Sequence, residues 1–180
     1  MAGQEKRDKL LDIAERVLLE RGFGGTTIEA IAAEAGMTKG WVFHYFQSKR
    51  EIILAIIDRF EDHLREGRDR LLQTLPDSPS RFLKATVLAM LEYREGTNGK
   101  VSNLGGMLDV PEYRERVAEL KVRIFNELVT HHPNREEAAM ALVIVDGLWM
   151  NNQFKIPVYY DGCIQRMEEL LLASVDAMGQ

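Results

Sequence analysis

The sequence is poor in the residues that build disulfide-linked or membrane-spanning proteins. Among its 180 residues there is one cysteine, Cys163. A lone cysteine excludes an internal disulfide, which fits a protein of a reducing compartment. The longest unbroken apolar run, residues 138–145, is far too short to cross a bilayer, and the charged first residues contain no apolar signal region. We therefore expect a soluble, cytoplasmic protein without a membrane partner.

Patterns of catalysis and metal binding are equally scarce. His131 and His132 are adjacent, and His63 has no second ligand at helical spacing. There is no glycine-rich phosphate loop, no nucleophile elbow and no evident histidine partner for Cys163. The sequence thus predicts no enzyme, no cofactor and no metal site. A small-molecule-modifying enzyme is retained only as the weakest alternative.

The net charge of −5 is unevenly distributed along the chain. Residues 1–51 hold eight Lys/Arg and eight Asp/Glu, whereas residues 52–180 hold fifteen against twenty and so supply the whole excess. Residues 36–50 carry three basic residues, one histidine and no acid. An acidic body with a locally positive tip is compatible with binding DNA through that tip alone.

Nearly every segment has the 3.6-residue period of a helix, and no segment alternates as a strand does. The composition, 46% hydrophobic and 28% charged, is that of an ordinary globular protein. We expect an all-α fold of about nine helices. Their approximate ranges are 4–21, 27–35, a short helix after residue 38, 48–73, 80–95, 101–108, 111–130, 134–154 and 162–177.

Local signals mark several of these helix ends. Gly22 stands where a left-handed residue ends the first helix. Residues 26–29, Thr-Thr-Ile-Glu, form a capping-box pattern for the second helix, and Thr38 is the expected cap of the third. Residues 48–51, Ser-Lys-Arg-Glu, form a second capping box that opens the long fourth helix.

The second and third helices have the pattern of a helix-turn-helix. Gly36 allows the sharp turn between them, and Ala32 lies one helical turn earlier, where the two backbones need a small residue. We expect buried contacts between the helices at Ile31, Ala35, Met37, Val42 and Tyr45.

Residues 7–57 closely resemble the N-terminal domain of the tetracycline-repressor (TetR) family. The landmarks are Ala14, Gly22-Phe23, Thr26-Thr27-Ile28, Ile31-Ala32, Ala35-Gly36, Thr38-Lys39-Gly40, Phe43-His44-Tyr45-Phe46 and Ser48-Lys49. The resemblance implies a helix-turn-helix DNA-binding domain at 1–47 and a helical ligand-binding and dimerisation domain at 48–180. It also implies that the third helix lies in the major groove of a palindromic double-stranded operator.

The chemistry of the third helix independently suits DNA. Thr38 and Lys39 can reach phosphates or guanine edges, while aromatic and imidazole side chains offer contacts to thymine methyls and hydrogen bonds. Lys49 resembles the family's phosphate anchor at a helix N-terminus. Phe46 is expected in the core instead. The candidate DNA-binding residues are Thr27, Thr38, Lys39, Gly40, Trp41, Phe43, His44, Tyr45 and Lys49.

Two of these positions depart from the family pattern. Phe43 stands where tyrosine is commonest, so the phosphate hydrogen bond of that tyrosine is absent and Tyr45 is the replacement donor we consider. Trp41 stands where the family usually has a small residue. The operator sequence therefore cannot be inferred from the family.

The remaining helices must do more than complete the DNA-binding module. The family resemblance implies a small-molecule pocket in the bundle and a homodimer through the last two helices. The range 138–150 is apolar almost all round, so one chain alone is not expected to cover it. Ala139, Ala141, Gly147 and the apolar face of 162–177, which includes Leu171 and Val175, are the expected seams.

The candidates for the small-molecule pocket are aromatic and methionine side chains, which would form its apolar walls, together with a few polar side chains. They are Phe60, His63, Met90, Tyr93, Met107, Phe125, Trp149 and Asn152. The function predicted is a ligand-responsive transcription regulator, a repressor rather than an activator, released from DNA by an effector of unknown identity. The alternative from another class is a helical protein–protein interaction adaptor that does not bind specific DNA.

Overall fold

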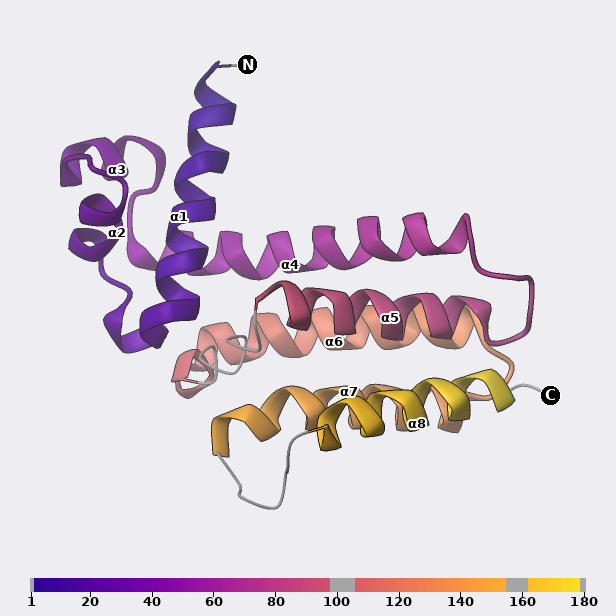
Figure 1. Cartoon of the computed structure of the whole chain (residues 1–180). Helices are drawn as coiled ribbons and strands as arrows, with labels where there is room; N and C mark the ends of the chain where they lie inside the picture. Colours follow the sequence, from indigo (N-terminus) through magenta and orange to yellow (C-terminus); the bar gives the residue numbers. More distant parts are fainter. Residues whose placement is uncertain (1, 98–105, 155–161, 179–180) are drawn as a thin grey trace. The chain divides into compact units, whose positions relative to one another are not determined.

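The computed structural model describes residues 2–97, 106–154 and 162–178. Within these ranges the chain forms eight α-helices and no strand, so the predicted all-α class is confirmed (Figure 1). No helix in the described ranges is long and apolar enough to cross a membrane. The helices are α1 (Ala2–Gly25), α2 (Ile28–Glu34), α3 (Lys39–Tyr45), α4 (Lys49–Leu72), α5 (Arg81–Gly96), α6 (Pro111–His131), α7 (Arg135–Phe154) and α8 (Cys163–Ala177).

The difference between nine expected helices and eight observed ones concerns the range 101–108. Its first five residues lie outside the described part of the chain, and residues 106–109 form a short 3₁₀ turn rather than an α-helix. The backbone N–H of Val110 donates to the carbonyl of Met107 at 3.1 Å and completes this turn directly before Pro111 opens α6. Proline suits a first helical turn because its missing N–H would have no helical partner there.

Contacts within the chain divide it into two units. The first comprises Met1–Phe60 and Lys100–Val117, and the second comprises Glu61–Gly99 and Ala118–Gln180. Helices α4 and α6 therefore each contribute residues to both units. The domain boundary at residues 47/48 remains a prediction about function, because this division rests on packing alone.

The first unit is built around α1, α2 and α3. Gly22 has φ 69°, the left-handed conformation that its position predicts, but it kinks α1 and does not end it, since the helix continues to Gly25. Helix α1 packs on α2, and α2 packs on α3 (Figure 1). The core consists of side chains without solvent exposure, chiefly Leu10, Leu18, Ile31, Val42, Phe46, Ile52 and Ile53.

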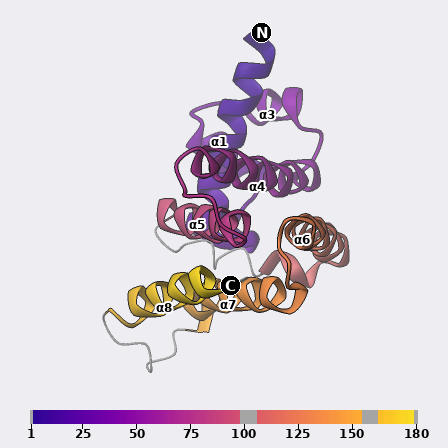
Figure 2. The same ribbon diagram turned by 90° about the vertical axis from the view of Figure 1, so that its right-hand side faces the viewer.

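The second unit is a helical bundle. Helix α5 packs against α7 and α8, which lie side by side in both views (Figures 1 and 2). Ala138, Ala141 and Val145 give α7 one face that is fully buried within the chain. The same helix leaves Met140 47% and Val143 69% exposed. Helix α7 is therefore not wholly internal in one chain, as its apolar sequence predicts.

Candidate nucleic-acid interface

The turn between α2 and α3 is closed by its own backbone. Gly36 has φ +65°, a conformation that disfavours residues with a Cβ atom. Its N–H donates to the carbonyl of Ala33 at 3.1 Å, and the N–H of Met37 donates to the carbonyl of Ala32 at 2.9 Å. The predicted helix-turn-helix is therefore present, and Gly36 is its left-handed residue.

The packing between these two helices differs from the prediction at three positions, most strongly at Met37. Ile31, Ala32 and Val42 are buried as expected, whereas Ala35 and Tyr45 are only half-buried. The sequence pattern predicts a buried Met37, but its side chain is 50% exposed. The reason is local: Met37 lies in the turn itself, so its backbone N–H closes the turn while the side chain lies outside the contact between the helices.

Threonine hydroxyls cap both helices of the motif. The Thr27 side chain accepts a hydrogen bond from the backbone N–H of Ala30 at 3.1 Å, and Thr38 accepts one from Trp41 at 3.3 Å. The capping-box pattern at 26–29 places the first cap one residue too early. Thr26 is fully buried instead, and its hydroxyl donates to the carbonyl of Gly22 at 2.8 Å.

The start of α4 has the Ser48 cap that its sequence predicts, but the Glu51 carboxylate accepts from Gln47, one residue before the cap, and not from Ser48 as in a strict capping box. The N–H of Glu51 donates to the Ser48 hydroxyl at 3.2 Å, and the N–H of Gln47 donates to the Glu51 carboxylate at 2.7 Å. Satisfying both donors fixes the direction in which α4 leaves the helix-turn-helix.

Lys49 makes contacts inside the first unit. Its Nζ donates to the carbonyl oxygen of Phe23 at 2.6 Å and lies 3.8 Å from the centroid of the Phe23 ring. Burial lowers the pKa of the Lys49 ammonium from its ordinary value. Lys49 therefore joins the start of α4 to the end of α1, and its role as a phosphate anchor remains a prediction.

The outer surface of α3 carries an aromatic cluster. Trp41 and Tyr45 meet edge to face with ring centroids 5.1 Å apart, and His44 meets Tyr45 in the same way at 4.8 Å. His44 is exposed, and Phe43 is 44% exposed. The neighbouring Gly40 is exposed as well. The side chains of this face fix one another through ring contacts and still meet solvent.

Phe46, at the end of α3, has the structural role that its sequence position predicts. Its side chain is fully buried, and the Arg7 guanidinium lies 4.4 Å from its ring centroid. A side chain in this position anchors α3 to the core and is withdrawn from the candidate DNA surface.

Lys39, the only lysine of α3, forms an ion pair with Glu29 at the start of α2. Both side chains are more than half exposed. The hydrogen bond from Lys39 is the main reason why the pKa of Glu29 is lowered, together with the Glu29 backbone hydrogen bond and the Lys39 charge. Because the pair is exposed, a DNA phosphate can compete for Lys39.

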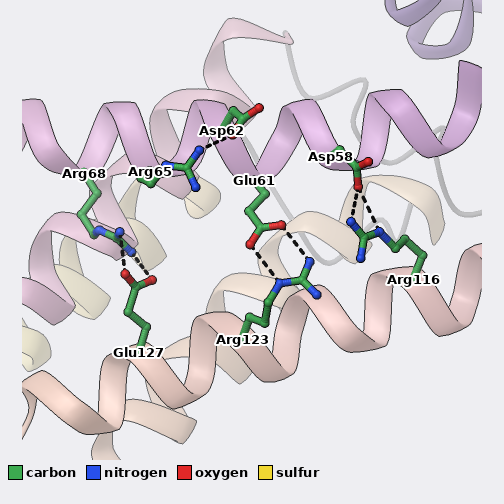
Figure 3. A network of polar contacts seen from close by, with 8 residues as sticks. All are labelled: Asp58, Glu61, Asp62, Arg65, Arg68, Arg116, Arg123 and Glu127. Carbon is green, nitrogen blue, oxygen red and sulfur yellow. Dashed lines mark hydrogen bonds and ion pairs between the residues drawn. The ribbon is translucent and has the colours of Figure 1, made fainter.

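A second ion-pair cluster of the first unit was not predicted from the sequence. Arg50 binds the Glu112 carboxylate with two nitrogens, the Nε at 2.6 Å, and this hydrogen bond lowers the pKa of Glu112. Arg116 binds Asp58 with its Nε at 2.9 Å (Figure 3). These contacts link the N-terminal part of α6 to α4 within the first unit.

Tyr113 adds an aromatic contact to the same cluster. Its ring meets that of Phe23 edge to face, with centroids 5.7 Å apart, and its side chain is 5% exposed. Burial raises the pKa of the Tyr113 hydroxyl. Phe23 is thus held by both Lys49 and Tyr113. The only sequence signal for this cluster is an aromatic residue two positions after Pro111, which is too common a pattern to identify a partner.

The predicted pocket residues do not form one described cluster. His63 and Tyr93 lie near each other with ring centroids 6.1 Å apart, and Met90 is buried in α5. Phe60 and Met107 belong to the first unit. Phe125 is half-buried, with the Arg135 guanidinium 5.3 Å from its ring centroid. The side chains of Trp149 and Asn152 lie outside the described residues.

Two family models match the chain. Residues 10–56 match bacterial regulatory proteins of the tetR family, and residues 80–176 match the tetracyclin repressor-like C-terminal domain. The first range contains the helix-turn-helix, and the second covers more than half of the chain.

Curated relatives include two regulators of Mycolicibacterium smegmatis. The transcriptional activator FasR is 35% identical over 91 residues, which cover 51% of this chain and 41% of FasR. The transcriptional repressor KstR2 is 31% identical over 96 residues, covering 53% of this chain and 46% of KstR2. The matches therefore span less than half the length of these relatives.

Solved structures share the fold over nearly the whole chain. A TetR-family transcriptional regulator of Streptomyces coelicolor has a TM-score of 0.74 at 17% identity, covering 98% of this chain and 94% of that one. The fatty acid degradation regulator FadR of Bacillus halodurans has a TM-score of 0.71 at 19% identity, covering 93% and 94%. With both family models matched in order along one all-helical chain, the protein belongs to the TetR family of bacterial transcription regulators.

Proposed function

We propose that this protein is a transcriptional repressor that binds a palindromic operator as a homodimer and leaves it when a small molecule binds its second unit. The observation that carries the proposal is α3, a short helix capped by Thr38 whose aromatic and imidazole side chains meet solvent beside Lys39. An α-helix of this kind fits the major groove, where such side chains distinguish base pairs.

The homodimer is supported by an apolar face that the single chain leaves uncovered. Met140 and Val143 lie three residues apart on α7, hence on one side of it, and Leu170 of α8 is 52% exposed. Ala141, Leu171 and Val175, predicted as parts of the seam, are buried within the chain and belong to its own core. A two-fold dimer would place the two copies of α3, the recognition helices, about 34–36 Å apart, which is one turn of DNA.

Release by an effector is the part of the proposal that concerns α4. This helix contributes residues to both units, so a ligand that shifts its second half would change the spacing of the two copies of α3. Of the predicted pocket residues, those of the second unit remain candidates for the effector site: His63, Met90, Tyr93, Phe125, Trp149 and Asn152. Phe60 and Met107 belong to the first unit and are not part of this proposal. If bound effector left operator affinity unchanged, this mechanism would be wrong.

The other classes of function have less support. The relatives are named as transcription regulators, which argues against a role in catalysis and against an adaptor that does not bind DNA. We infer a non-enzymatic protein of the cytoplasm, where operator DNA is accessible. The named relatives include an activator and a repressor. Repression is therefore our own choice between the two.

Selection of DNA from a random pool by the full-length protein tests the proposal. We expect enrichment of one palindromic sequence, and we expect His44→Ala to lose preference at one base pair in each half-site while keeping its thermal stability. Val122→Ala is a matched control, because Val122 is 56% exposed on α6. A pool without any enriched sequence would instead support the adaptor.

A further inference from the structure

A half-open hollow of about 250 Å³ lies between α4 and α6 of the second unit, and none of the predicted pocket residues lines it. Its apolar wall comprises Leu64 and Ile124, which are 2% and 6% exposed. Three arginines, Arg65, Arg68 and Arg123, contribute the positive charges of the lining. Glu61 and Glu127 contribute the negative ones, so the lining carries an excess of one positive charge.

Arg68 is the buried charge of this hollow. Its side chain is 5% exposed, and its two terminal nitrogens donate to the Glu127 carboxylate at 2.7 and 2.9 Å (Figure 3). The guanidinium carbon lies over the Phe82 ring, 4.6 Å from its centroid. Its Nε is buried without a hydrogen bond, with the Asp69 carboxylate 3.9 Å away. Since arginine does not give up its proton, Arg68 keeps its positive charge in every state of the protein and favours an anion beside it.

The side chains of Arg68 and Glu127 differ in solvent exposure. Arg68 is enclosed, whereas the Glu127 side chain is 45% exposed and can turn into water. Another carboxylate can then occupy the same two nitrogens, because the guanidinium fork binds any carboxylate in the geometry that Glu127 shows. The exchange preserves the charge balance of the hollow and costs little, since the carboxylate that leaves is hydrated outside.

We propose that this hollow binds an amphipathic carboxylate whose head group replaces Glu127 on Arg68 and whose hydrocarbon part lies against Leu64 and Ile124. The inference rests on the proposed function, since it names the chemical class of the effector. A phosphate ester suits the hollow less well, because Arg65 and Arg123 are already paired with Asp62 and Glu61, which leaves Arg68 alone to balance a second negative charge.

Exchange at Arg68 has a direct consequence for the bundle. Figure 3 shows two ion pairs between α4 and α6 in the second unit, and Arg68–Glu127 is one of them. In the other, the Nε and a terminal nitrogen of Arg123 donate to the Glu61 carboxylate at 3.0 and 2.7 Å. Carboxylate binding removes the first link and leaves the second. The ligand thereby alters the coupling of α4 to α6 without any change in the fold.

Titration calorimetry of the full-length protein with octanoate tests the proposal, with 1-octanol as the uncharged match and octyl phosphate as the dianionic one. We expect octanoate to bind, 1-octanol to show no binding and octyl phosphate to bind more weakly. In Glu127→Gln the competing carboxylate is gone and Arg68 keeps a hydrogen-bond acceptor, so octanoate affinity should rise roughly tenfold. Glu169→Gln is the control, since it removes an equal charge from an exposed pair with Arg166 on α8.

Octanoate affinity that is the same in wild type and Glu127→Gln would overturn the exchange. Equal binding of 1-octanol, or tighter binding of octyl phosphate, would overturn the carboxylate head group. These outcomes are independent of the DNA selection. If the protein enriches a palindrome but does not bind octanoate, the proposed function stands and only this inference fails. If it binds octanoate but enriches no DNA sequence, the proposed function fails and the carboxylate site stands.

Discussion

Replacing Lys49 with methionine should destabilise the protein by about 2 kcal/mol. Two contacts are lost: a charge-assisted hydrogen bond to the Phe23 carbonyl, worth about 1.5–3 kcal/mol, and the cation–π contact with the Phe23 ring, worth about 0.5–2 kcal/mol. Relief from desolvating the ammonium offsets part of the sum, since burial lowers the pKa of Lys49. Methionine keeps the length of the side chain and still packs on the ring.

Urea unfolding gives the stability change, and thermal unfolding should show a decrease of about 4–8 °C for a chain of this size. Lys9→Met is the matched control, because Lys9 pairs with Glu5 across the solvent-exposed side of α1 and such pairs contribute about 0.5 kcal/mol or less. If the two variants lose equal stability, the contact between Lys49 and Phe23 does not hold α1 to α4.

The same variant also tests the predicted phosphate contact of Lys49. An ammonium that donates one hydrogen to Phe23 has two more, so operator affinity should fall for all sequences and its salt dependence should become shallower by about one unit. An unchanged salt slope together with reduced stability would assign Lys49 a purely structural role.

Three further changes test other parts of the protein. Glu29→Gln should tighten operator binding about threefold by freeing Lys39 for phosphate, which fluorescence anisotropy measures; weaker binding would show that the pair orders α3 for DNA. Glu112→Gln should make the free energy of unfolding less dependent on pH below about 4.5. The pKa of the Glu112 carboxyl is lowered in the folded protein, so this group stabilises the fold above its ordinary pKa of 4.5. Its contribution is lost as the pH falls from 4.5 toward the folded pKa. If the free energy of unfolding of variant and wild type changed equally with pH in this range, the link between Glu112 and Arg50 would be contradicted. Val143→Glu should yield monomers in sedimentation experiments without loss of helicity, whereas a persistent dimer would move the interface away from α7.

The helix boundaries were predictable because their causes are local. A hydroxyl at Thr38 or Ser48 caps the helix directly after it, and Gly36 supplies the one backbone conformation that the turn needs. The error at Thr26 has the same origin. Two adjacent threonines offer two registers for one cap, and tertiary packing decided between them by burying the first.

The contacts across long stretches of sequence were not predictable in the same way. Arg50 meets a partner 62 residues away, and no pattern within either helix names that partner. Arg68 did leave a signal, since it follows Ile57 and Leu64 on the buried side of α4, where an arginine is out of place. A charged residue in the apolar stripe of a helix indicates an internal ion pair or a ligand contact, although it does not name the partner.

The aromatic cluster on α3 has a practical consequence. The chain has two tryptophans, and one of them, Trp41, stands half-buried against Tyr45 on the face assigned to DNA. Its emission depends on how much water reaches the indole, and insertion into a groove excludes that water. With Trp149→Phe removing the second emitter, the recognition helix carries an intrinsic optical reporter. Operator binding then becomes measurable in real time on unlabelled protein and unlabelled DNA.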